Sequence, residues 1–465
     1  MSTASTTPEL GQRALVLGAS MAGLLAARIL SERFGEVMLL ERDELPDAAA
    51  ARKGVPQSPH AHGLLARGCE IIESLCPGFT AALLAQGGAA GDIQYNAAFC
   101  AGGQLFARAP CGRFGIAASR SALEAELRRR VLALENVRAR TSVDIVEPMF
   151  DPLEQRVTGI RIVRRDSGVE ETLCADLIVD CTGRGSRTPG WLRSWGFDAP
   201  PEERIEVGIG YATAYFRRDP QHAERPVVTI CPATAQSPLP GVFIAQEPLT
   251  DGVQRWVVTL GGYRGDHPSA TLDGMRERAA RMGCADLARI VNDAEPIGAP
   301  LRYSFPASQR RHYERLARFP GRFLVLGDAL ASFNPIYGQG MTVAACEALA
   351  LRAALAKHGL RPALTRGYFA AAAKTIDVPW QLAVGSDLAI PGVRGPRPLP
   401  LRLVNAYIAR LFRAAPHDAE VTRAFTLVTH LLAPPHSLFS PGIVARVLWH
   451  GRRRSDTAAH SLAHA

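Results

Sequence analysis

The sequence of 465 residues has few lysines, no paired cysteines and no long apolar run. Its nine cysteines are scattered singly, without a CxxC pair or the spacing of a metal site. This pattern argues against a disulfide-stapled secreted domain, favours reduced thiols and predicts no metal site. Because no apolar run is long enough to cross a bilayer and no signal peptide is visible, we expect a cytoplasmic protein with at most peripheral membrane association.

The basic charge comes mainly from arginine. The net charge is +9 and the pI about 9.3, with arginine runs at residues 128–130 and 452–454. No aromatic residues are interleaved with either run, so we interpret both as surface charge and predict no nucleic-acid partner. A hydrophobic content of 47% with 21% charged residues indicates a globular chain.

A glycine-rich turn lies near the start of the chain. The segment reads as a strand (14–18), a tight turn (19–23) and a helix (24–30). The turn is a GxGxxG fingerprint with Ser20 at the second glycine, where a small side chain still lets backbone approach a pyrophosphate. Glu41 ends the next expected strand, roughly 20 residues on, where dinucleotide folds bond the adenosine ribose. These features predict a dinucleotide site; an ordinary βαβ unit with a glycine turn is the alternative.

A second informative segment spans residues 321–341, GRFLVLGDALASFNPIYGQGM. It predicts a buried strand (323–326), a sharp turn at Gly327, the carboxylate of Asp328, a Pro-Gly loop and a helix from Met341. A strand end, an acid and a helix start can together hold a polyol by its hydroxyls and a ring carbonyl by backbone amides. No second GxGxxG occurs at a strand-to-helix turn, so we expect one dinucleotide site.

The predicted domains are interleaved along the chain. Residues 12–200 and 296–360 form a discontinuous nucleotide-binding domain, and alternating apolar residues between 205 and 262 predict an antiparallel sheet in an inserted domain, 201–295. Residues 361–455 read as a helical region broken by prolines, and we expect flexible tails at 1–11 and 456–465. The fold class is therefore α/β, with a Rossmann-like fold assembled from separated segments.

Three motifs in chain order resemble the FAD-dependent monooxygenases of the aromatic-hydroxylase type. They are GASMAG (18–23) with Glu41, LIVDCTGRGSR (177–187) and LVLGDALASFNPIYGQGM (324–341). The resemblance covers about residues 12–360 and implies an FAD-binding fold of the glutathione-reductase type with an inserted substrate domain. A closer similarity, to squalene-epoxidase-like enzymes and bacterial flavin epoxidases of polyether biosynthesis, is carried by residues 52–57, 60–65 and 378–387.

The resemblance implies roles for individual residues in binding FAD. The pyrophosphate would be cradled by Gly18, Ser20, Met21, Ala22 and Gly23. Around the adenosine and phosphates it implies Glu41 on the ribose, Arg42 beside the adenine, and Arg52 and Arg120 as further contacts. Around the ribityl chain and ring it implies Asp328 on the hydroxyls, Pro335 and Gly338 against the ring, and the amides of Gly340 and Met341 at its pyrimidine end.

The middle motif departs from the family at one position. Thr182-Gly183 stands where the family usually carries Asp-Gly, an acid associated with FAD and NAD(P)H handling. The electron donor therefore stays open between NAD(P)H and a separate flavin reductase. Asp180, two positions earlier, is expected to cap the strand end and not to replace the missing acid.

The resemblance implies oxygen transfer from O2 through a flavin hydroperoxide, so a catalytic side chain is optional and none is predicted. His60, Tyr211, Tyr215 and Tyr337 are candidates for the substrate pocket, although the tyrosines of the expected sheet fit a sheet core equally well. The apolar sheet and C-terminal region predict a hydrophobic small-molecule substrate. We expect the C-terminal helices either to pack on the enzyme body or to touch a membrane.

The resulting prediction is an FAD-dependent monooxygenase that epoxidises or hydroxylates a polyketide, isoprenoid or aromatic secondary metabolite. One alternative is a flavin reductase or dehydrogenase acting on an isoprenoid-like substrate. Another is a flavin-dependent halogenase, but that group depends on an active-site lysine and a tryptophan-rich motif, and Lys53 is the only lysine near a motif. A non-enzymatic FAD carrier is a fourth class, which the open flavin loop disfavours.

Overall fold

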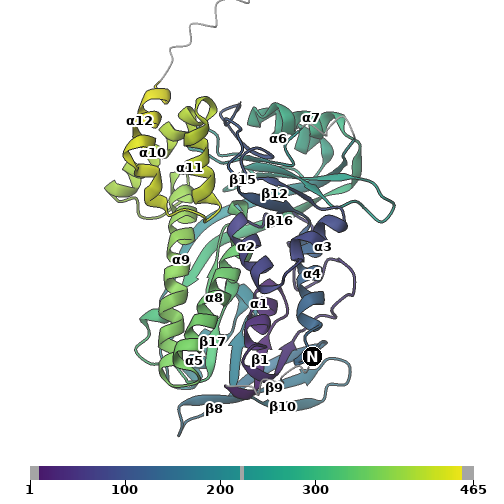
Figure 1. Ribbon diagram of the computed structural model, residues 1–465, viewed down its shortest axis with the longest axis vertical. Coiled ribbons are helices and arrows are strands. Elements are labelled where there is room, and N and C mark those ends of the chain that lie inside the picture. Colours follow the sequence, from purple (N-terminus) through teal and green to yellow (C-terminus); the bar gives the residue numbers. More distant parts are fainter. Residues whose placement is uncertain (1–9, 220–224, 453–465) are drawn as a thin grey trace, which may run out of the picture.

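A five-stranded parallel sheet forms the lower half of the computed structural model, which describes residues 10–219 and 225–452 (Figure 1). Its order is β17 (Phe323–Val325), β11 (Leu177–Asp180), β1 (Gly11–Leu17), β2 (Phe34–Leu40) and β7 (Val137–Arg140). The strands are short and apolar because both faces of the sheet are covered. They come from four separated parts of the chain, which confirms the predicted discontinuous nucleotide-binding fold.

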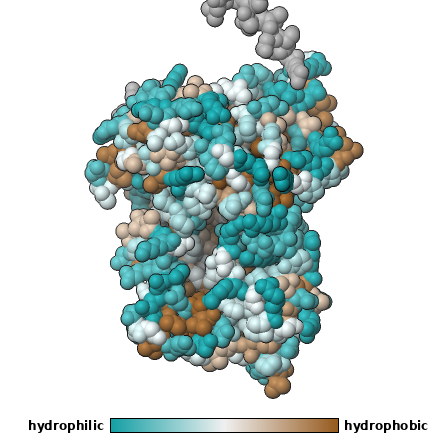
Figure 2. All heavy atoms as spheres, turned by 180° about the vertical axis from the view of Figure 1, so that it is seen from behind, coloured by the Kyte–Doolittle hydropathy of each residue, from teal (hydrophilic) through white to brown (hydrophobic). Residues whose placement is uncertain are grey.

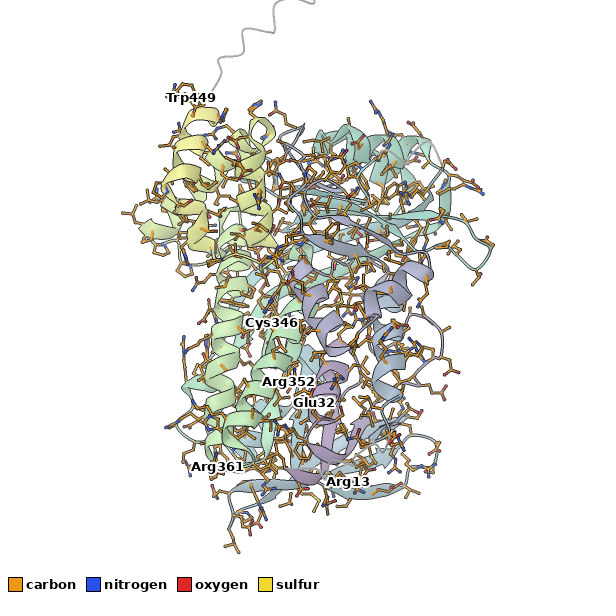
Figure 3. All side chains as sticks on the ribbon, in the orientation of Figure 1. Arg13, Glu32, Cys346, Arg352, Arg361 and Trp449 are labelled. Carbon is orange, nitrogen blue, oxygen red and sulfur yellow. The ribbon has the colours of Figure 1, made fainter. Side chains whose placement is uncertain are left out.

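Helices cover one face of this sheet and a small antiparallel sheet covers the other. The helices are α1 (Met21–Leu30), α4 (Arg120–Leu132) and α8 (Gly340–His358). The antiparallel sheet is β8 (Val143–Asp151), β9 (Arg156–Arg164) and β10 (Glu170–Cys174), which includes the predicted hairpin. An ion pair of 2.9 Å between Arg352 of α8 and Glu32, just after α1, joins two helices that are distant in sequence (Figure 3).

An eight-stranded sheet forms the upper half. Its order is β18 (Ala331–Ser332), β16 (Pro296–Arg311), β12 (Glu202–Arg217), β15 (Arg255–Tyr263), β14 (Gly241–Gln246), β13 (Val228–Cys231), β4 (Ala97–Ala101) and β5 (Gln104–Leu105). The antiparallel pairing of β12 to β15 confirms the sheet expected from alternation. The predicted limits of 201–295 are too narrow, because β16 pairs with β12 and β4 pairs in parallel with β13.

Further helices and strands surround these sheets. They are α2 (Ala66–Leu75), α3 (Phe79–Ala85), β3 (Ala89–Asp92), β6 (Phe114–Ala117), α5 (Thr188–Ser194), α6 (Leu272–Met282) and α7 (Ala285–Asp293). Helices α6 and α7 pack on the outer face of the large sheet through a separate apolar cluster. Gly11 belongs to β1, so the expected N-terminal tail is shorter than predicted; residues 1–9 and 456–465 lie outside the described part of the chain.

The C-terminal region is helical, as predicted. It comprises α9 (Ala363–Ala389), α10 (Leu399–Ala414), α11 (Ala419–Thr429) and α12 (Pro441–His450). Helix α9 runs down the side of the molecule, and the other three lie beside the large sheet (Figure 1). Proline lacks the N–H that a helix interior needs, so Pro398 and Pro400 stand at the start of α10, whereas α9 accommodates Pro379.

The surface is mostly hydrophilic when seen from behind, with separate hydrophobic patches (Figure 2). Within residues 10–219 and 225–452, no single helix combines the length and apolarity of a membrane span; the pair α2–α3, bent by 107°, meets both criteria only when taken together.

The arginine run at 128–130 is not simply surface charge, which corrects the sequence interpretation. Arg128 is buried and donates a hydrogen bond to the carbonyl of Pro46. Arg130 donates to the carbonyl of Gly78 over 2.7 Å and pairs with Glu126 over 2.5 Å. These arginines therefore tie loops to α4.

Candidate functional site

The glycine turn brings β1 and α1 into close contact. Gly18 has a φ of +96°, and a Cβ there would lie 2.7 Å from the carbonyl oxygen of Cys181. At Gly23 a Cβ would lie 1.8 Å from the carbonyl oxygen of Gly18, so no side chain fits. Ser20 stands at the N-cap of α1 without a side-chain cap bond. Met21 is buried and Ala22 packs at Gly327, so the N-terminal amides of α1 are presented by a rigid turn.

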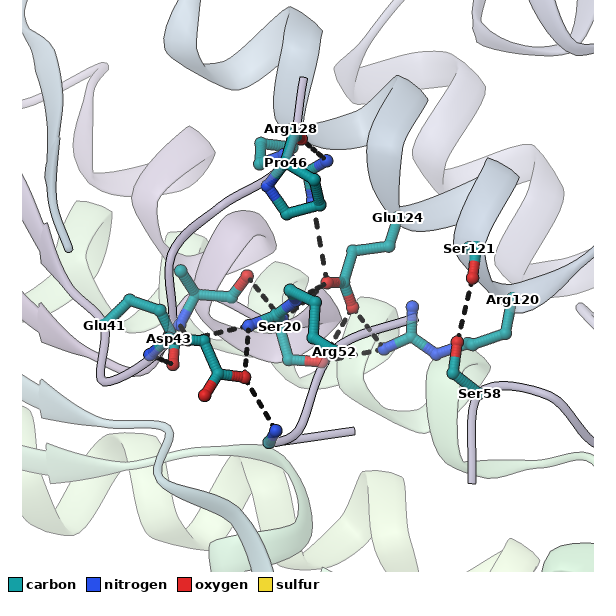
Figure 4. A network of polar contacts seen from close by, with 12 residues as sticks. Ser20, Glu41, Asp43, Pro46, Arg52, Ser58, Arg120, Ser121, Glu124 and Arg128 are labelled. Atoms are coloured by element: carbon teal, nitrogen blue, oxygen red, sulfur yellow. Dashed lines mark hydrogen bonds and ion pairs between the residues drawn. The ribbon is translucent and has the colours of Figure 1, made fainter. Parts of the chain in front are cut away.

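A cluster of buried charges surrounds this helix start (Figure 4). Glu124 of α4 is at its centre: it pairs with Arg52 over 2.5 Å and Arg120 over 2.7 Å, and accepts a 3.0 Å hydrogen bond from Ser20. Arg120 also donates to the Ser20 hydroxyl over 2.7 Å. Burial alone would raise the pKa of Glu124, but the two arginines outweigh it and hold the pKa below its usual value. The carboxylate is therefore ionised and fixes both arginines.

Glu41 and Arg42 point in different directions. Glu41 is 8% exposed and accepts hydrogen bonds from the amides of Ala19 over 2.8 Å and Asp43 over 3.0 Å. Its carboxylate thus lies against the glycine turn, as expected for the ribose-binding acid. Arg42 instead pairs with Asp144 over 3.0 Å with a side chain that is 69% exposed. Its proposed place beside the adenine needs a change of rotamer.

Asp328 follows β17 and carries an accessible carboxylate. No hydrogen bond to this group occurs within the described residues, and a Cβ at Gly340 would lie 3.9 Å from its Oδ1 atom. The residue is exposed to open space, yet the surrounding protein desolvates the carboxylate enough to raise its pKa, although Arg120 and Arg184 act to lower it. An acceptor held in this space without a partner is suited to hydroxyl donors of a ligand.

The loop between Asn334 and Gly340 forms one wall beyond Asp328. Gly338 adopts a left-handed φ of +63°, and a Cβ there would stand 3.7 Å from the backbone of Gly63. Gln339 at the N-cap of α8 makes no side-chain cap bond. The backbone amides of Gly340 and Met341 therefore start the helix without a hydrogen bond from a capping side chain. Two backbones without side chains thus face each other next to a positive helix terminus.

A buried carboxyl supports this loop from α9. Asp387 Oδ1 accepts hydrogen bonds from Tyr337 over 2.8 Å, Asn334 over 2.8 Å and Tyr263 over 3.0 Å, whereas Oδ2 is buried without a partner. Burial raises the pKa of Asp387 to about 7, despite these three hydrogen bonds. The sequence reasoning did not assign Asp387, although it ends the 378–387 segment that carried the closer resemblance.

A second buried acid lies under the turn after β17. Glu347 of α8 accepts a 2.6 Å hydrogen bond from the amide of Gly327. Burial raises the pKa of Glu347 to about 8. The acid is therefore mainly neutral near pH 7 and holds the turn that presents Asp328.

An apolar cavity of about 290 Å³ opens beside the loop. Its walls come from the loop at 61–65, the large sheet, residues 335–339 and the C-terminal helices. Among them, Ile408, Phe412, Phe425 and Leu438 belong to the region after residue 361. The C-terminal helices therefore close the cavity, while Leu399, Leu403 and Trp449 are exposed on their outer side.

Two of the four predicted pocket residues line the cavity. Tyr211 and Tyr337 do so. His60 and Tyr215 instead make hydrogen bonds that join the 59–62 loop to the large sheet. His60 is bonded to Thr213 over 2.8 Å, and the Tyr215 hydroxyl donates to the carbonyl of Pro59 over 2.5 Å. These two residues do not line this cavity, because their polar atoms are used inside the protein.

Two histidines besides these four residues line the cavity. They are His62 and His430, and burial lowers the pKa of each to about 4. His430 accepts a 3.1 Å hydrogen bond from the amide of Ala66. Both are neutral at physiological pH, and the positions follow from tertiary packing that no local motif signals.

The departure at Thr182 has a clear structural role. Asp180 is fully buried and accepts four hydrogen bonds: two from Thr182, at 2.9 and 2.6 Å, and one each from Ser186 and Thr188, both at 2.5 Å. This confirms Asp180 as a cap of the strand end. The Thr182 hydroxyl is used for that cap.

A larger hollow of about 670 Å³ lies at the amino ends of the same strands, lined by Gln12, Arg13, Asp176 and Arg322. It is open and strongly charged. Ligands of open parallel sheets bind at the carboxyl ends of the strands, so we place the site at the glycine turn and not here.

The residues between the glycine turn and the cavity fit FAD. The turn leaves no room for side chains, Arg120 Nη1 is buried without a hydrogen-bond partner, and the Asp328 carboxylate is free to accept. These groups suit a pyrophosphate and a polyol chain, respectively.

Residues 12–363 match the family model described as FAD binding domain. The chain therefore belongs to this family of FAD-dependent oxidoreductases of the aromatic-hydroxylase type. It is 36% identical over 453 residues to Protein Rv3254 of Mycobacterium tuberculosis, covering 95% of this chain and 94% of the relative.

Solved structures share the fold at low sequence identity. A flavoprotein/dehydrogenase from Cytophaga hutchinsonii matches with a TM-score of 0.65 and 16% identity, over 95% of this chain and 100% of that one. PqsL from Pseudomonas aeruginosa, described as a probable FAD-dependent monooxygenase, matches with a TM-score of 0.57 and 18% identity, over 82% and 97%. These likenesses establish the fold alone.

Proposed function

We propose that the protein is an FAD-dependent monooxygenase that epoxidises or hydroxylates a small hydrophobic molecule with O2. The observation that carries this proposal is the apolar cavity of about 290 Å³, which has the glycine loop at 335–339 as one of its walls. A substrate in the cavity would lie directly against the flavin ring. Apolar walls also exclude water from the reacting atoms.

The assignments along the site follow from the observed geometry. Gly18, Gly23 and the start of α1 would hold the pyrophosphate, with Arg120 and Arg52 beside it. Asp328 would accept hydrogen bonds from the ribityl hydroxyls, and Pro335 and Gly338 would face the ring. When bound, FAD supplies the oxygen chemistry; the start of α8, at Gly340 and Met341, would stabilise negative charge at the pyrimidine end.

The substrate is proposed to be an apolar secondary metabolite, such as a polyketide, isoprenoid or aromatic compound. The electrons that reduce FAD would come from NAD(P)H or from a separate flavin reductase, because Thr182 leaves both routes open. The exposed Leu399, Leu403 and Trp449 on a basic chain support at most peripheral contact with an anionic membrane. We propose no nucleic-acid partner.

Two other flavin chemistries remain weaker candidates. A reductase of an isoprenoid-like substrate would use the same cavity and cofactor. A halogenase needs an active-site lysine, and none of the residues that line the cavity in the described chain is a lysine. The monooxygenase proposal therefore fits the cavity better than the halogenase one.

The test follows the oxygen atom. The purified protein is reconstituted with FAD, checked for a flavin spectrum, and supplied with NADPH, a flavin reductase, ¹⁸O2 and the apolar probes styrene and naphthalene. We expect ¹⁸O in an epoxide or hydroxylated product. A hydrogenated probe without ¹⁸O, or a brominated probe when bromide is added, would refute the proposal. Failure to bind FAD would also overturn the cofactor assignment.

A further inference from the structure

Three cysteines far apart in sequence meet in the upper half of the molecule. They are Cys100 on β4, Cys231 on β13 and Cys284 just before α7, and their sulfur atoms all lie within 4.8 Å of one another. All three are buried. The parallel register of β4 and β13 places Ile230 opposite Phe99, so Cys231 and Cys100 are neighbours across the ladder. The spacing of the cysteines along the sequence predicted no metal site, because spacing does not show which cysteines meet in the folded chain.

The cluster is prepared to carry negative charge. Cys284 is the N-cap residue of α7, a nine-residue helix. The thiols of Cys100 and Cys231 lie beside the Cys284 sulfur at this helix start. Arg225 lies at the same helix start, donating to the Asp286 carbonyl over 3.3 Å. A thiolate is thus stabilised by a helix terminus and by two thiols that are themselves potential ligands.

The ligand set favours a soft ion with low coordination number. Within the described residues, no histidine or carboxylate completes the group of three. Thiolates bind both zinc and Cu(I), but zinc almost always takes four ligands, which the three cysteines do not supply.

We propose that Cys100, Cys231 and Cys284 form a binding site for one Cu(I) ion. Binding forms three Cu–S bonds, releases to solvent the protons still held by the thiols, and changes no oxidation state. Cys231 belongs to the cavity wall, which gives the ion an entry path. The bound ion would join β4, β13 and α7, which come from three separate parts of the chain.

The first experiment needs no variant. The FAD-loaded protein is titrated anaerobically with Cu(I) against the chelator bicinchoninate, and free thiols are then alkylated with iodoacetamide and mapped by peptide mass spectrometry. We expect one Cu(I) held per chain and, compared with the same protein alkylated without Cu(I), additional protection of Cys100, Cys231 and Cys284 only. Failure to retain Cu(I), or protection of other cysteines, would overturn the proposal.

The second experiment uses matched variants. Cys284→Ser should lower the Cu(I) affinity on the order of 100-fold, because one thiolate ligand is lost. Cys346→Ser is the control: this partly buried cysteine lies on α8, away from α6 and α7 (Figure 3), and its loss should leave Cu(I) affinity unchanged. FAD content verifies that each variant is folded. Equal Cu(I) affinity in the two variants would refute the site. A disulfide between two of the three cysteines would also refute it if the protein binds no Cu(I) after that disulfide has been reduced.

Discussion

The glycine turn and the apolar cavity both contain buried carboxyl groups, but with different partners. Glu124 at the turn is paired with Arg52 and Arg120, and its pKa is held below the usual value. Asp387 beside the cavity has only hydroxyl and amide partners, and burial raises its pKa to about 7. The partner, and not the burial, decides whether a buried acid is charged.

This difference matches what each end would hold. A charged network is suited to fixing a pyrophosphate beside two arginines. An acid with a raised pKa can support a flavin loop with less negative charge than an ordinary carboxylate would carry. Four substitutions test the contrast, beginning with the largest expected effect.

Replacing Glu124 with alanine should be the most damaging change, because Arg52 and Arg120 would be left buried without their common partner. We expect the free energy of unfolding to fall by about 3–5 kcal/mol. Urea unfolding of the FAD-free protein measures it. Glu70→Ala is the control, since Glu70 pairs on the surface with Arg67 and Arg113 and should cost about 1 kcal/mol or less. Equal losses in the two variants would contradict a central role for Glu124.

Asp387→Asn should change the pH dependence of stability. An acid with a raised folded pKa binds its proton more tightly when folded, so its contribution to stability falls as the pH rises from about 4 to about 7. Asparagine resembles the protonated acid and removes this fall, so the variant should gain up to about 4 kcal/mol relative to the native chain across this window.

The measurement is urea unfolding at several pH values, with native and variant chains compared at each. Asp377→Asn on the same helix is the control, because Asp377 is half exposed and paired with Arg310. It should keep the native slope. A slope unchanged in Asp387→Asn would show that Asp387 is ionised in the folded chain.

Asp328→Ala should weaken FAD retention without a comparable loss of stability, because the carboxylate has no protein hydrogen bond to lose. We expect the FAD affinity to fall roughly 10- to 100-fold, as for lost hydrogen bonds to a charged group. Flavin fluorescence during dialysis or titration measures it. Asp273→Ala, on the exposed side of α6, is the control. Unchanged FAD occupancy would show that the ribityl assignment is wrong.

Arg42→Ala should have the smallest effect. The guanidinium is 69% exposed and makes a surface ion pair, so stability should change by about 1 kcal/mol or less. FAD affinity should change by less than about tenfold. A larger loss of affinity would show that Arg42 turns toward the adenine when FAD binds.

The sequence predicted the nucleotide-binding fold well, because glycine turns and buried strands are local signals. The strand–turn–helix at Gly18, the turn at Gly327 and the cap role of Asp180 could all be inferred from neighbouring residues. The predicted assembly of this fold from separated segments also followed from where these signals occur.

Features that depend on distant packing were missed. The pairing of β4 with β13 joins residues more than a hundred positions apart, so no window of sequence contains it. Arg128 looked like surface charge because its partner, the Pro46 carbonyl, is a backbone atom of a distant loop. The positions of His430 and Asp387 near the cavity depend on helices whose docking no motif specifies.

The family segment ends at residue 363, but Leu382, Ile408, Phe425 and Leu438 of the cavity wall all follow it. The residues proposed to hold the cofactor therefore lie within the family segment, whereas one part of the cavity wall lies after it. Exchange of the segment after 363 between relatives would alter which molecules fit while leaving Gly18, Glu41 and Asp328 untouched.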